Sequence, residues 1–275
     1  MPLLDNNWLV CLLSILFSFI GVAVWSFFFF NFSSTETTSR RLLVYAFLCG
    51  VVAMLSAYLI EQFIFGTFRE GTIIYAFIVT ASVEEVIKFV ILKKFLHSHK
   101  VDQIIDGIKI GLYVGLGFAF AENIFYFFNF ISTASSISSV VTIITIRALL
   151  STLAHGLYGI VMGYYLSLAK FHAIYRNNFL IISISTAVLL HGFFNYFLLI
   201  SLGIWSVILM VLILVVVLIW YDDRRNIEVS ISTDFINRKS APFMSSQHEL
   251  EVILSKQNAS LGVFEKLLAW FPHEK

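Results

Sequence analysis

Long apolar stretches separated by short polar segments make up most of residues 1–221. Seven stretches reach about 20 residues, which at 1.5 Å per residue is enough to cross about 30 Å of hydrocarbon as a helix. They lie at about 8–30, 42–64, 72–96, 107–130, 139–168, 178–201 and 203–221. They do not alternate apolar and polar residues as membrane-spanning strands do. The pattern predicts an all-α, polytopic membrane bundle of about seven transmembrane helices.

The chain changes character after residue 221. Residues 222–246 are polar and rich in serine, and residues 247–271 mix charges with regularly placed apolar residues. The apolar positions are Leu250, Leu254, Leu261, Phe264, Leu268 and Phe271. We therefore expect a transmembrane domain at 1–221, and at 222–275 a cytoplasmic linker followed by an amphipathic helix on the membrane surface or on the bundle.

Basic residues lie mainly on one side of the predicted bundle. Nine of them follow the first, third, fifth and seventh stretches, whereas Arg69 lies in a loop of the opposite set. The nine are Arg40, Arg41, Lys93, Lys94, Lys100, Lys170, Arg176, Arg224 and Arg225. Because basic loops stay in the cytoplasm, we expect a multi-pass protein of the cell membrane with its N-terminus outside and its C-terminus in the cytoplasm.

Composition agrees with this class. Hydrophobic residues make up 59% of the chain and charged residues only 13%. The net charge of +1 argues against a nucleic-acid partner. The stretch at 8–30 lacks a preceding basic region and is too long for a secretory signal, so we interpret it as a retained span. Cys11 and Cys49 lie in apolar stretches and are expected to be packing residues.

Charged and imidazole groups nevertheless lie near the middle of four apolar stretches. They are Glu84, Glu85, Lys88, Glu122, Arg147, His155 and His191. A charge at the centre of a spanning helix costs about 2.5–3.5 kcal/mol, which is too much for most of these groups to face lipid. The glutamates and histidines lie about 18–24 Å into their helices, near the middle of the membrane. We therefore expect them to converge on one polar site inside the bundle.

The segment Glu84-Glu85-Val86-Ile87-Lys88 sets two carboxylates three and four residues before a lysine. Both spacings let the lysine meet a carboxylate on a helix. Adjacent residues point about 100° apart, so one glutamate pairs with the lysine while the other faces a cavity. A purely structural ion pair needs only one glutamate. The second glutamate therefore indicates a catalytic role, with one carboxylate as a base and the other as its support.

Small and polar residues follow helical spacing in the next three stretches. They are Gly107, Gly111, Gly115 and Glu122 in the first, Arg147, Ser151, His155, Gly159 and Gly163 in the second, and His191 and Asn195 in the third. Glycines four residues apart let another helix approach closely, which places Glu122 in a helix interface. Asn123, on the next face, is expected to bond a neighbouring helix.

Three glutamates close together cannot all be ionised in a dry cavity without compensating cations. Lys88 and Arg147 compensate two of them, and a bound proton or a metal ion meets the remaining demand. Histidine nitrogen and carboxylate oxygen suit zinc, and two histidines with one glutamate and an open fourth position match a catalytic site. A metal ion there would acidify water, and a spare glutamate would accept its proton.

Five ordered segments carry a family resemblance. They are Glu84-Glu85-x-x-Lys88, Asp106-Gly107, the run from Gly115 to Asn123, Arg147 with His155, and His191-Gly192-x-x-Asn195. In this order they resemble the PrsW family of intramembrane metalloproteases, which is distantly similar to the CAAX-type prenyl endopeptidases. The segments cover the stretches between 72 and 201, and the rest of the chain carries no family inference. The resemblance implies that residues 1–221 form a transmembrane protease domain with catalytic spans at about 72–201.

The same resemblance implies roles for individual residues in peptide-bond hydrolysis. Glu84, Glu85 and His191 would be catalytic, with Glu85 as the base on water and Glu84 paired with Lys88. Asn195, one turn beyond His191, would steady the oxyanion. The predicted metal ligands, for zinc or another divalent ion, are Glu122, His155 and His191, and the supporting residues are Lys88, Asn123 and Arg147.

The chain departs from the CAAX-type pattern at one position. Those relatives have Phe-x-x-x-His where this chain has Phe118-x-x-x-Glu122, as PrsW-like members do. A metal-free reaction, in which carboxylate and imidazole alone activate the water, therefore stays open.

Partners and rival functions follow from the same cluster. By resemblance, the substrate is a single-span membrane protein such as an anti-sigma factor. The alternative is a proton or divalent-metal transporter, because Glu/His chains also relay ions. The 3 prolines lie at positions 2, 242 and 272, so proline breaks none of the stretches that flank the site, as discontinuous transporter helices would require. A scaffold without chemistry would leave the buried charges unexplained.

Overall fold

The computed structural model describes residues 7–32, 38–64, 72–97, 101, 103–133, 136–171 and 174–219. Every secondary-structure element in this part of the chain is helical, which confirms the predicted class. The linker and amphipathic helix predicted at 222–275 lie outside the described residues.

The helices follow one another with short breaks. They are α1 (Asn7–Phe32), α2 (Arg40–Ile64), η1 (Tyr75–Ala81), α3 (Ser82–Leu96), α4 (Ile104–Thr133), α5 (Ile137–Ile146), η2 (Arg147–Ser151), α6 (Thr152–Phe171), α7 (Arg176–Leu199) and a last helix, Gly203–Ile219. The π-helical turn η1 runs directly into α3, and α5 continues through the π-helical turn η2 into α6. Each of these two groups therefore forms one continuous rod.

Among the described residues, five helices are long and apolar enough to cross a membrane. They are Trp8–Phe29, Arg40–Ile64, Ile104–Thr133, Ser138–Phe171 and Arg176–Leu199. The other two predicted spans are also helical: one is the charged rod of η1 and α3, and the other is the shorter apolar helix Gly203–Ile219. A multi-pass helical protein is therefore confirmed, and the count of seven spans stays a prediction.

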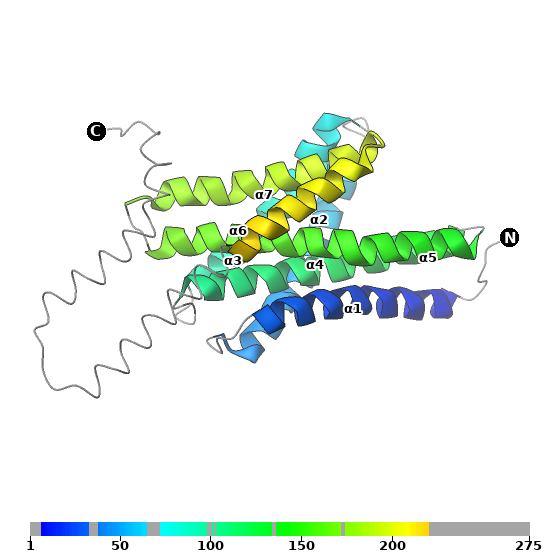
Figure 1. Cartoon of the computed structure of the whole chain (residues 1–275), viewed down its shortest axis with the longest axis horizontal. Coiled ribbons are helices and arrows are strands. Elements are labelled where there is room, and N and C mark those ends of the chain that lie inside the picture. Colours follow the sequence, from blue (N-terminus) through cyan, green and yellow to red (C-terminus); the bar gives the residue numbers. More distant parts are fainter. Residues whose placement is uncertain are drawn as a thin grey trace, which may run out of the picture. The chain divides into compact units, whose positions relative to one another are not determined.

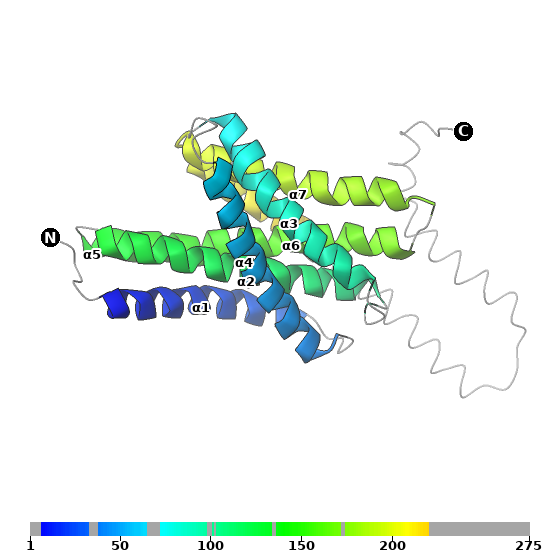
Figure 2. The same cartoon turned by 180° about the vertical axis from the view of Figure 1, so that it is seen from behind.

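α4 is the central helix. In its most apolar window 78% of the residues are buried, against 28% in α1 and in α2. It packs against α1, α2 and α6. Figures 1 and 2 show that the axes of α1, α4, α6 and α7 are nearly parallel or antiparallel, while α2 and the rod of η1 and α3 cross them obliquely. Polar residues on α4 therefore lie where several helices meet.

Glycines bring the backbones of α4 and α6 into contact. A Cβ atom on Gly111 would collide with the carbonyl oxygen of Gly159, and one on Gly115 would collide with the carbonyl oxygen of His155. The close approach predicted from the glycine spacing is confirmed. The contacts run antiparallel, Gly107 with Gly163, Gly111 with Gly159 and Gly115 with His155.

Replacing Gly111 by alanine should destabilise the protein, because the added methyl group forces α4 and α6 apart. Overpacking of this kind costs about 1–3 kcal/mol. The matched control is Gly203→Ala, whose Cβ atom would meet only Leu198 Cδ2, at an ordinary 3.6 Å. We expect the unfolding temperature in detergent to fall for Gly111→Ala and to stay unchanged for Gly203→Ala. Equal unfolding temperatures for the two variants would contradict the contact.

Candidate active site

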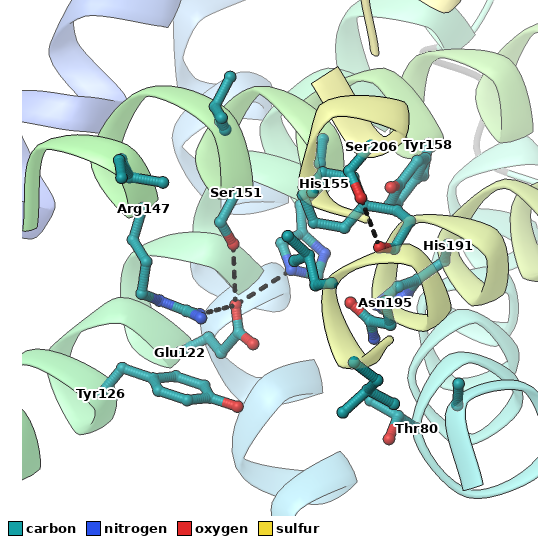
Figure 3. Close-up of a pocket in the computed structure, with 18 of the residues that line it drawn as sticks. Thr80, Glu122, Tyr126, Arg147, Ser151, His155, Tyr158, His191, Asn195 and Ser206 are labelled. Atoms are coloured by element: carbon teal, nitrogen blue, oxygen red, sulfur yellow. Dashed lines mark hydrogen bonds and ion pairs between the residues drawn. The ribbon is translucent and has the colours of Figure 1, made fainter. Parts of the chain in front are cut away.

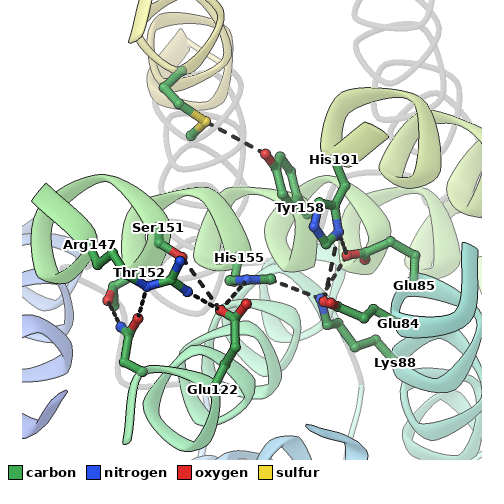
Figure 4. A network of polar contacts seen from close by, with 12 residues as sticks. Glu84, Glu85, Lys88, Glu122, Arg147, Ser151, Thr152, His155, Tyr158 and His191 are labelled. Atoms are coloured by element: carbon green, nitrogen blue, oxygen red, sulfur yellow. Dashed lines mark hydrogen bonds and ion pairs between the residues drawn. The ribbon is translucent and has the colours of Figure 1, made fainter. Parts of the chain in front are cut away.

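Ionisable side chains from α3, α4, α6 and α7 meet inside the bundle (Figure 4). Glu84, Glu85, His155 and His191 form a compact group, in which one possible metal-binding atom of each residue lies within 4.8 Å of the others. All four residues are buried. The structure therefore brings together four residues that lie on three different helices.

Lys88 is a fully buried cation against this group. Its Nζ atom donates hydrogen bonds to Glu85 Oε1 at 2.7 Å and to His155 Nδ1 at 3.0 Å. It also lies 3.8 Å from the centre of the Phe118 ring. The predicted ion pair with Glu84 is present at 3.7 Å. The closer carboxylate, however, is Glu85, which reverses the expected preference.

His155 connects Lys88 to Glu122. A lysine ammonium carries only donors, so Nδ1 of His155 accepts and the ring proton is on Nε2. This Nε2 lies 3.0 Å from Glu122 Oε2 and donates to it. The Phe118 ring lies against the imidazole, with 5.1 Å between ring centroids. The imidazole is therefore held at both nitrogens and on one face.

His191 is held by Glu85. Its Nδ1 atom lies 2.8 Å from Glu85 Oε1 and 3.9 Å from Glu84 Oε2. Because an ionised carboxylate only accepts hydrogen bonds, Nδ1 carries the proton and Nε2 keeps the lone pair. A neutral imidazole with a free lone pair can accept a proton or bind a metal ion.

Glu122 and Arg147 form a second charged pair on the far side of His155. Glu122 Oε2 lies 3.1 Å from Arg147 Nη2. Arg147 Nε donates to Asn123 Oδ1 at 3.2 Å, and the guanidinium lies 3.5 Å from the centre of the Tyr126 ring. Asn123 Nδ2 in turn donates to Thr152 Oγ1 at 2.9 Å. Asn123 thus bonds the neighbouring rod, as its position on α4 suggested.

The predicted metal ligands occupy two places. His155 and His191 belong to the compact group, together with Glu84 and Glu85. Glu122 contacts the His155 nitrogen that points away from Lys88 and is not part of the group. The geometry thus groups the histidines with the two glutamates of α3, and the identity of the ligands stays a prediction.

A cavity of about 320 Å³ adjoins the two histidines (Figure 3). Its wall includes His155, His191, Asn195 and Glu122. The two glutamates of α3 and Lys88 are not part of this wall, and Lys88 and Glu85 contact the Nδ1 atoms of the imidazoles. A substrate in the cavity would therefore meet the imidazoles and Asn195 first.

The two π-helical turns contribute to the cavity wall. η1 provides Thr80, and η2 provides Arg147. At η1 the carbonyl oxygen of Phe77 accepts from the backbone N–H of Ser82 and also from the Ser82 hydroxyl, at 2.6 Å. π-Helical turns are frequent at functional sites. The apolar and polar pattern of the sequence contains no signal for either turn.

Sequence reasoning missed two residues near the site. Tyr158 stacks on His191. Its position one helical turn after His155 places it on the same helix face, and this spacing could have identified it from the sequence. Glu61 of α2 has a buried Oε1 atom without a hydrogen-bond partner among the described residues. The sequence feature that would have identified Glu61 is its position four residues after Ala57, on the same helix face. Ala57 packs against α4.

Removing the Lys88 ammonium should destabilise the protein strongly, because Glu85 and His155 lose a buried hydrogen-bond donor. Breaking a buried ion pair by removing one partner costs about 3–5 kcal/mol. We expect Lys88→Met to lower the free energy of unfolding in detergent by this amount. Lys93→Met, at an exposed position of the same helix, should leave it unchanged. Equal free energies of unfolding for the two variants would rule out a charge-compensating role for Lys88.

Comparison with known proteins assigns the chain to a family. The model described as PrsW family intramembrane metalloprotease matches residues 38–221. A Protease PrsW of Clostridioides difficile (strain 630) is 33% identical over 189 residues, which cover 68% of this chain and 76% of the relative. The Protease PrsW of Halalkalibacterium halodurans is 30% identical over 210 residues, which cover 75% of this chain and 92% of the relative. The Protease PrsW of Bacillus subtilis (strain 168) is 32% identical over 211 residues, which cover 74% of this chain and 89% of the relative.

No solved structure matches the chain. The family match extends from α2 to the last helix, beyond the stretches whose motifs suggested the resemblance. It contains every residue of the compact group and of the cavity wall. The chain therefore belongs to the PrsW family of intramembrane metalloproteases and is a multi-pass membrane protease.

Proposed function

We propose that this protease hydrolyses a peptide bond of a membrane-embedded substrate at the compact group. The observation that carries the proposal is the group itself: two carboxylates and two imidazoles, buried and within 4.8 Å, beside a cavity of about 320 Å³. Buried ionisable groups in membrane helices are costly and mark functional sites. The relatives named above are proteases, which favours hydrolysis over transport of protons or metal ions.

Glu84 is the carboxylate that we assign as general base. Its Oε2 atom has no hydrogen-bond partner in the described part of the chain, and Lys88 lies 3.7 Å away. Glu85 is more constrained, because its Oε1 atom accepts from Lys88 and from His191. A base needs a lone pair that can reach the proton of water. The contacts therefore favour Glu84 over the sequence-based choice of Glu85.

Glu85 acts through His191 in this proposal. It holds Nδ1–H of the imidazole, so the lone pair of Nε2 is available at the cavity wall. Asn195 lies one turn further along α7 and also lines the cavity. Its amide would donate a hydrogen bond to the oxyanion that forms during hydrolysis.

The compact group also fits the metal ion that the family name implies. Carboxylate oxygen and imidazole nitrogen are the ligands that zinc prefers. Glu84 Oε2 and Glu85 Oε2 are buried without a hydrogen-bond partner among the described residues. The Lys88 ammonium contacts the group, so the group already accommodates a positive charge. We propose that Glu85, His155 and His191 hold a divalent ion, with zinc as the expected metal, while Glu84 stays free as the base. Nδ1 of His155 would then bind the ion in place of its hydrogen bond from Lys88.

Such an ion, when bound, acidifies water and polarises carbonyl groups. Glu122 takes a different role from the one expected of it. It accepts from Nε2 of His155 and so fixes the orientation of that imidazole. Arg147 balances the charge of Glu122 at 3.1 Å. Partners of this kind tune a metal site without touching the metal.

The proposed topology keeps residues 1–221 as the transmembrane protease domain, with seven spans, the N-terminus outside and the C-terminus in the cytoplasm. Its support is the position of the helix ends. α1, α3 and α6 end, and α2, α4 and α7 begin, at the same end of the bundle (Figure 2). Basic residues at this end mark the cytoplasmic side. They are Arg40, Arg41, Lys93, Lys94, Lys170 and Arg176.

We further propose a single-span membrane protein as the substrate, with an anti-sigma factor as the expected example. The support is that the cavity lies among the helices α4, α6 and α7, each of which is long and apolar enough to cross the membrane. A substrate that reaches it must itself be inserted in the bilayer or lie close to it. Residues 222–275 are expected to form the cytoplasmic linker and amphipathic helix.

Substitution of the proposed catalytic groups should abolish cleavage of a co-reconstituted single-span membrane protein. Loss of a general base typically reduces the rate about 10²–10⁴-fold. We expect reductions in this range for Glu84→Gln and His191→Ala. Val86→Ala, at an exposed neighbouring position, should cleave like the intact chain. Full cleavage by Glu84→Gln would contradict the assigned base, and gel analysis of the product measures each rate.

Removal of metal should stop cleavage, and added zinc should restore it. Metal content, measured by mass spectrometry of the purified protein, provides a readout that is independent of activity. We expect His155→Ala to lose the metal. Glu122→Gln should only weaken its affinity, by about 10–100-fold, as for other residues that orient a ligand. A metal-free preparation with full activity would instead support activation of water by carboxylate and imidazole alone.

A further inference from the structure

Tyr158 is a buried aromatic residue that contacts both histidines of the site. It lies on α6 three residues after His155, is 0% exposed as a residue, and forms part of the cavity wall. Its ring stacks on the imidazole of His191, with 5.2 Å between centroids and an interplanar angle of 21°. It meets His155 edge to face at 6.0 Å and 76°. None of the steps proposed above uses this residue.

The Tyr158 hydroxyl faces the last helix. It donates to Met210 Sδ at 3.8 Å, and Met210 is 1% exposed. A thioether sulfur is a weak acceptor, so this bond contributes little energy. The contact nevertheless holds the phenol ring from the side opposite its own helix. The ring rather than the hydroxyl is therefore the part of Tyr158 that the structure holds most firmly against the site.

The imidazole of His191 needs such a contact. The hydrogen bond from Nδ1 to Glu85 fixes the position of one ring atom but does not by itself fix the plane of the ring. Stacking against Tyr158 fixes the plane of the imidazole. The His155 ring, perpendicular at 88° and 5.1 Å, bounds the imidazole from another direction.

We propose that Tyr158 is a positioning residue that sets the plane of the His191 imidazole and so keeps its second ring nitrogen at the cavity wall. This inference rests on the proposed role of His191 in hydrolysis. The aromatic ring performs the function, and the hydroxyl is dispensable. Met210 supports the ring, which connects the last helix to the site.

The test compares aromatic and aliphatic substitutions in the full-length protein. Misplacement of a reacting group by about 1 Å can reduce a rate about 100-fold. We expect Tyr158→Leu to lower kcat by about this factor with KM unchanged, whereas Tyr158→Phe keeps kcat close to that of the intact chain. Tyr158→Met is the second aliphatic variant if Tyr158→Leu does not fold, and unfolding temperatures are recorded for all variants.

Three results would overturn the inference. Full kcat in a folded aliphatic variant would show that His191 needs no stacking partner. Loss of kcat in Tyr158→Phe would transfer the role to the hydroxyl. If kcat and KM change equally in the aliphatic variants, and the unfolding temperature falls with them, Tyr158 is a packing residue without a positioning role.

His191→Ala, assayed in parallel, separates this inference from the proposed function. Full cleavage by His191→Ala would overturn both, because His191 would then take no part in hydrolysis. Loss of cleavage in His191→Ala together with full kcat in Tyr158→Leu would overturn the positioning role alone. Loss in both, with Tyr158→Phe active, is the expected result.

Discussion

The backbone contact between α4 and α6 determines which ionisable side chains of this protein meet inside the bundle. Gly111 and Gly159 leave no room for a side chain between the helices, and one turn later Gly115 meets the backbone of His155. Because the helices run antiparallel in a fixed register, Glu122 further along α4 reaches the rod of η2 and α6 beside the same histidine. The close approach that glycine permits thus aligns a carboxylate with an imidazole inside the membrane-spanning helices.

A second constraint is that every charge here must find its partner inside the protein. Lys88 donates to Glu85 and to His155, His155 donates to Glu122, and His191 donates to Glu85. The result is a continuous chain of hydrogen bonds in which each donor faces an acceptor. In a medium of low dielectric such a network is strong when complete and costly when one member is removed. It therefore fixes the tautomers of both histidines.

The network lies partly at the cavity wall and partly away from it. The carboxylates of α3 and Lys88 contact the Nδ1 atoms or lie near the imidazoles without lining the cavity, whereas both imidazoles form part of its wall. This arrangement keeps the ionisable groups of α3 inside the protein and leaves both imidazoles at the cavity wall. The last helix also contacts the helices that carry the site. Met210 contacts Tyr158, and Ser206 donates to the Phe194 carbonyl at 2.9 Å.

The sequence by itself determined the helical membrane class, because long apolar runs have no other stable form in a bilayer. It also determined which side chains could meet, because glycine and charge spacings define helix faces. It missed Tyr158 and both π-helical turns, and it paired Lys88 with Glu84, whereas Glu85 is the closer carboxylate. The positions of Lys88 and Tyr158 depend on contacts with other helices, namely the 3.0 Å hydrogen bond from Lys88 to His155 and the stacking of Tyr158 on His191. Only the tertiary structure decides them, because spacing along one helix does not say how far a neighbouring helix is rotated or shifted.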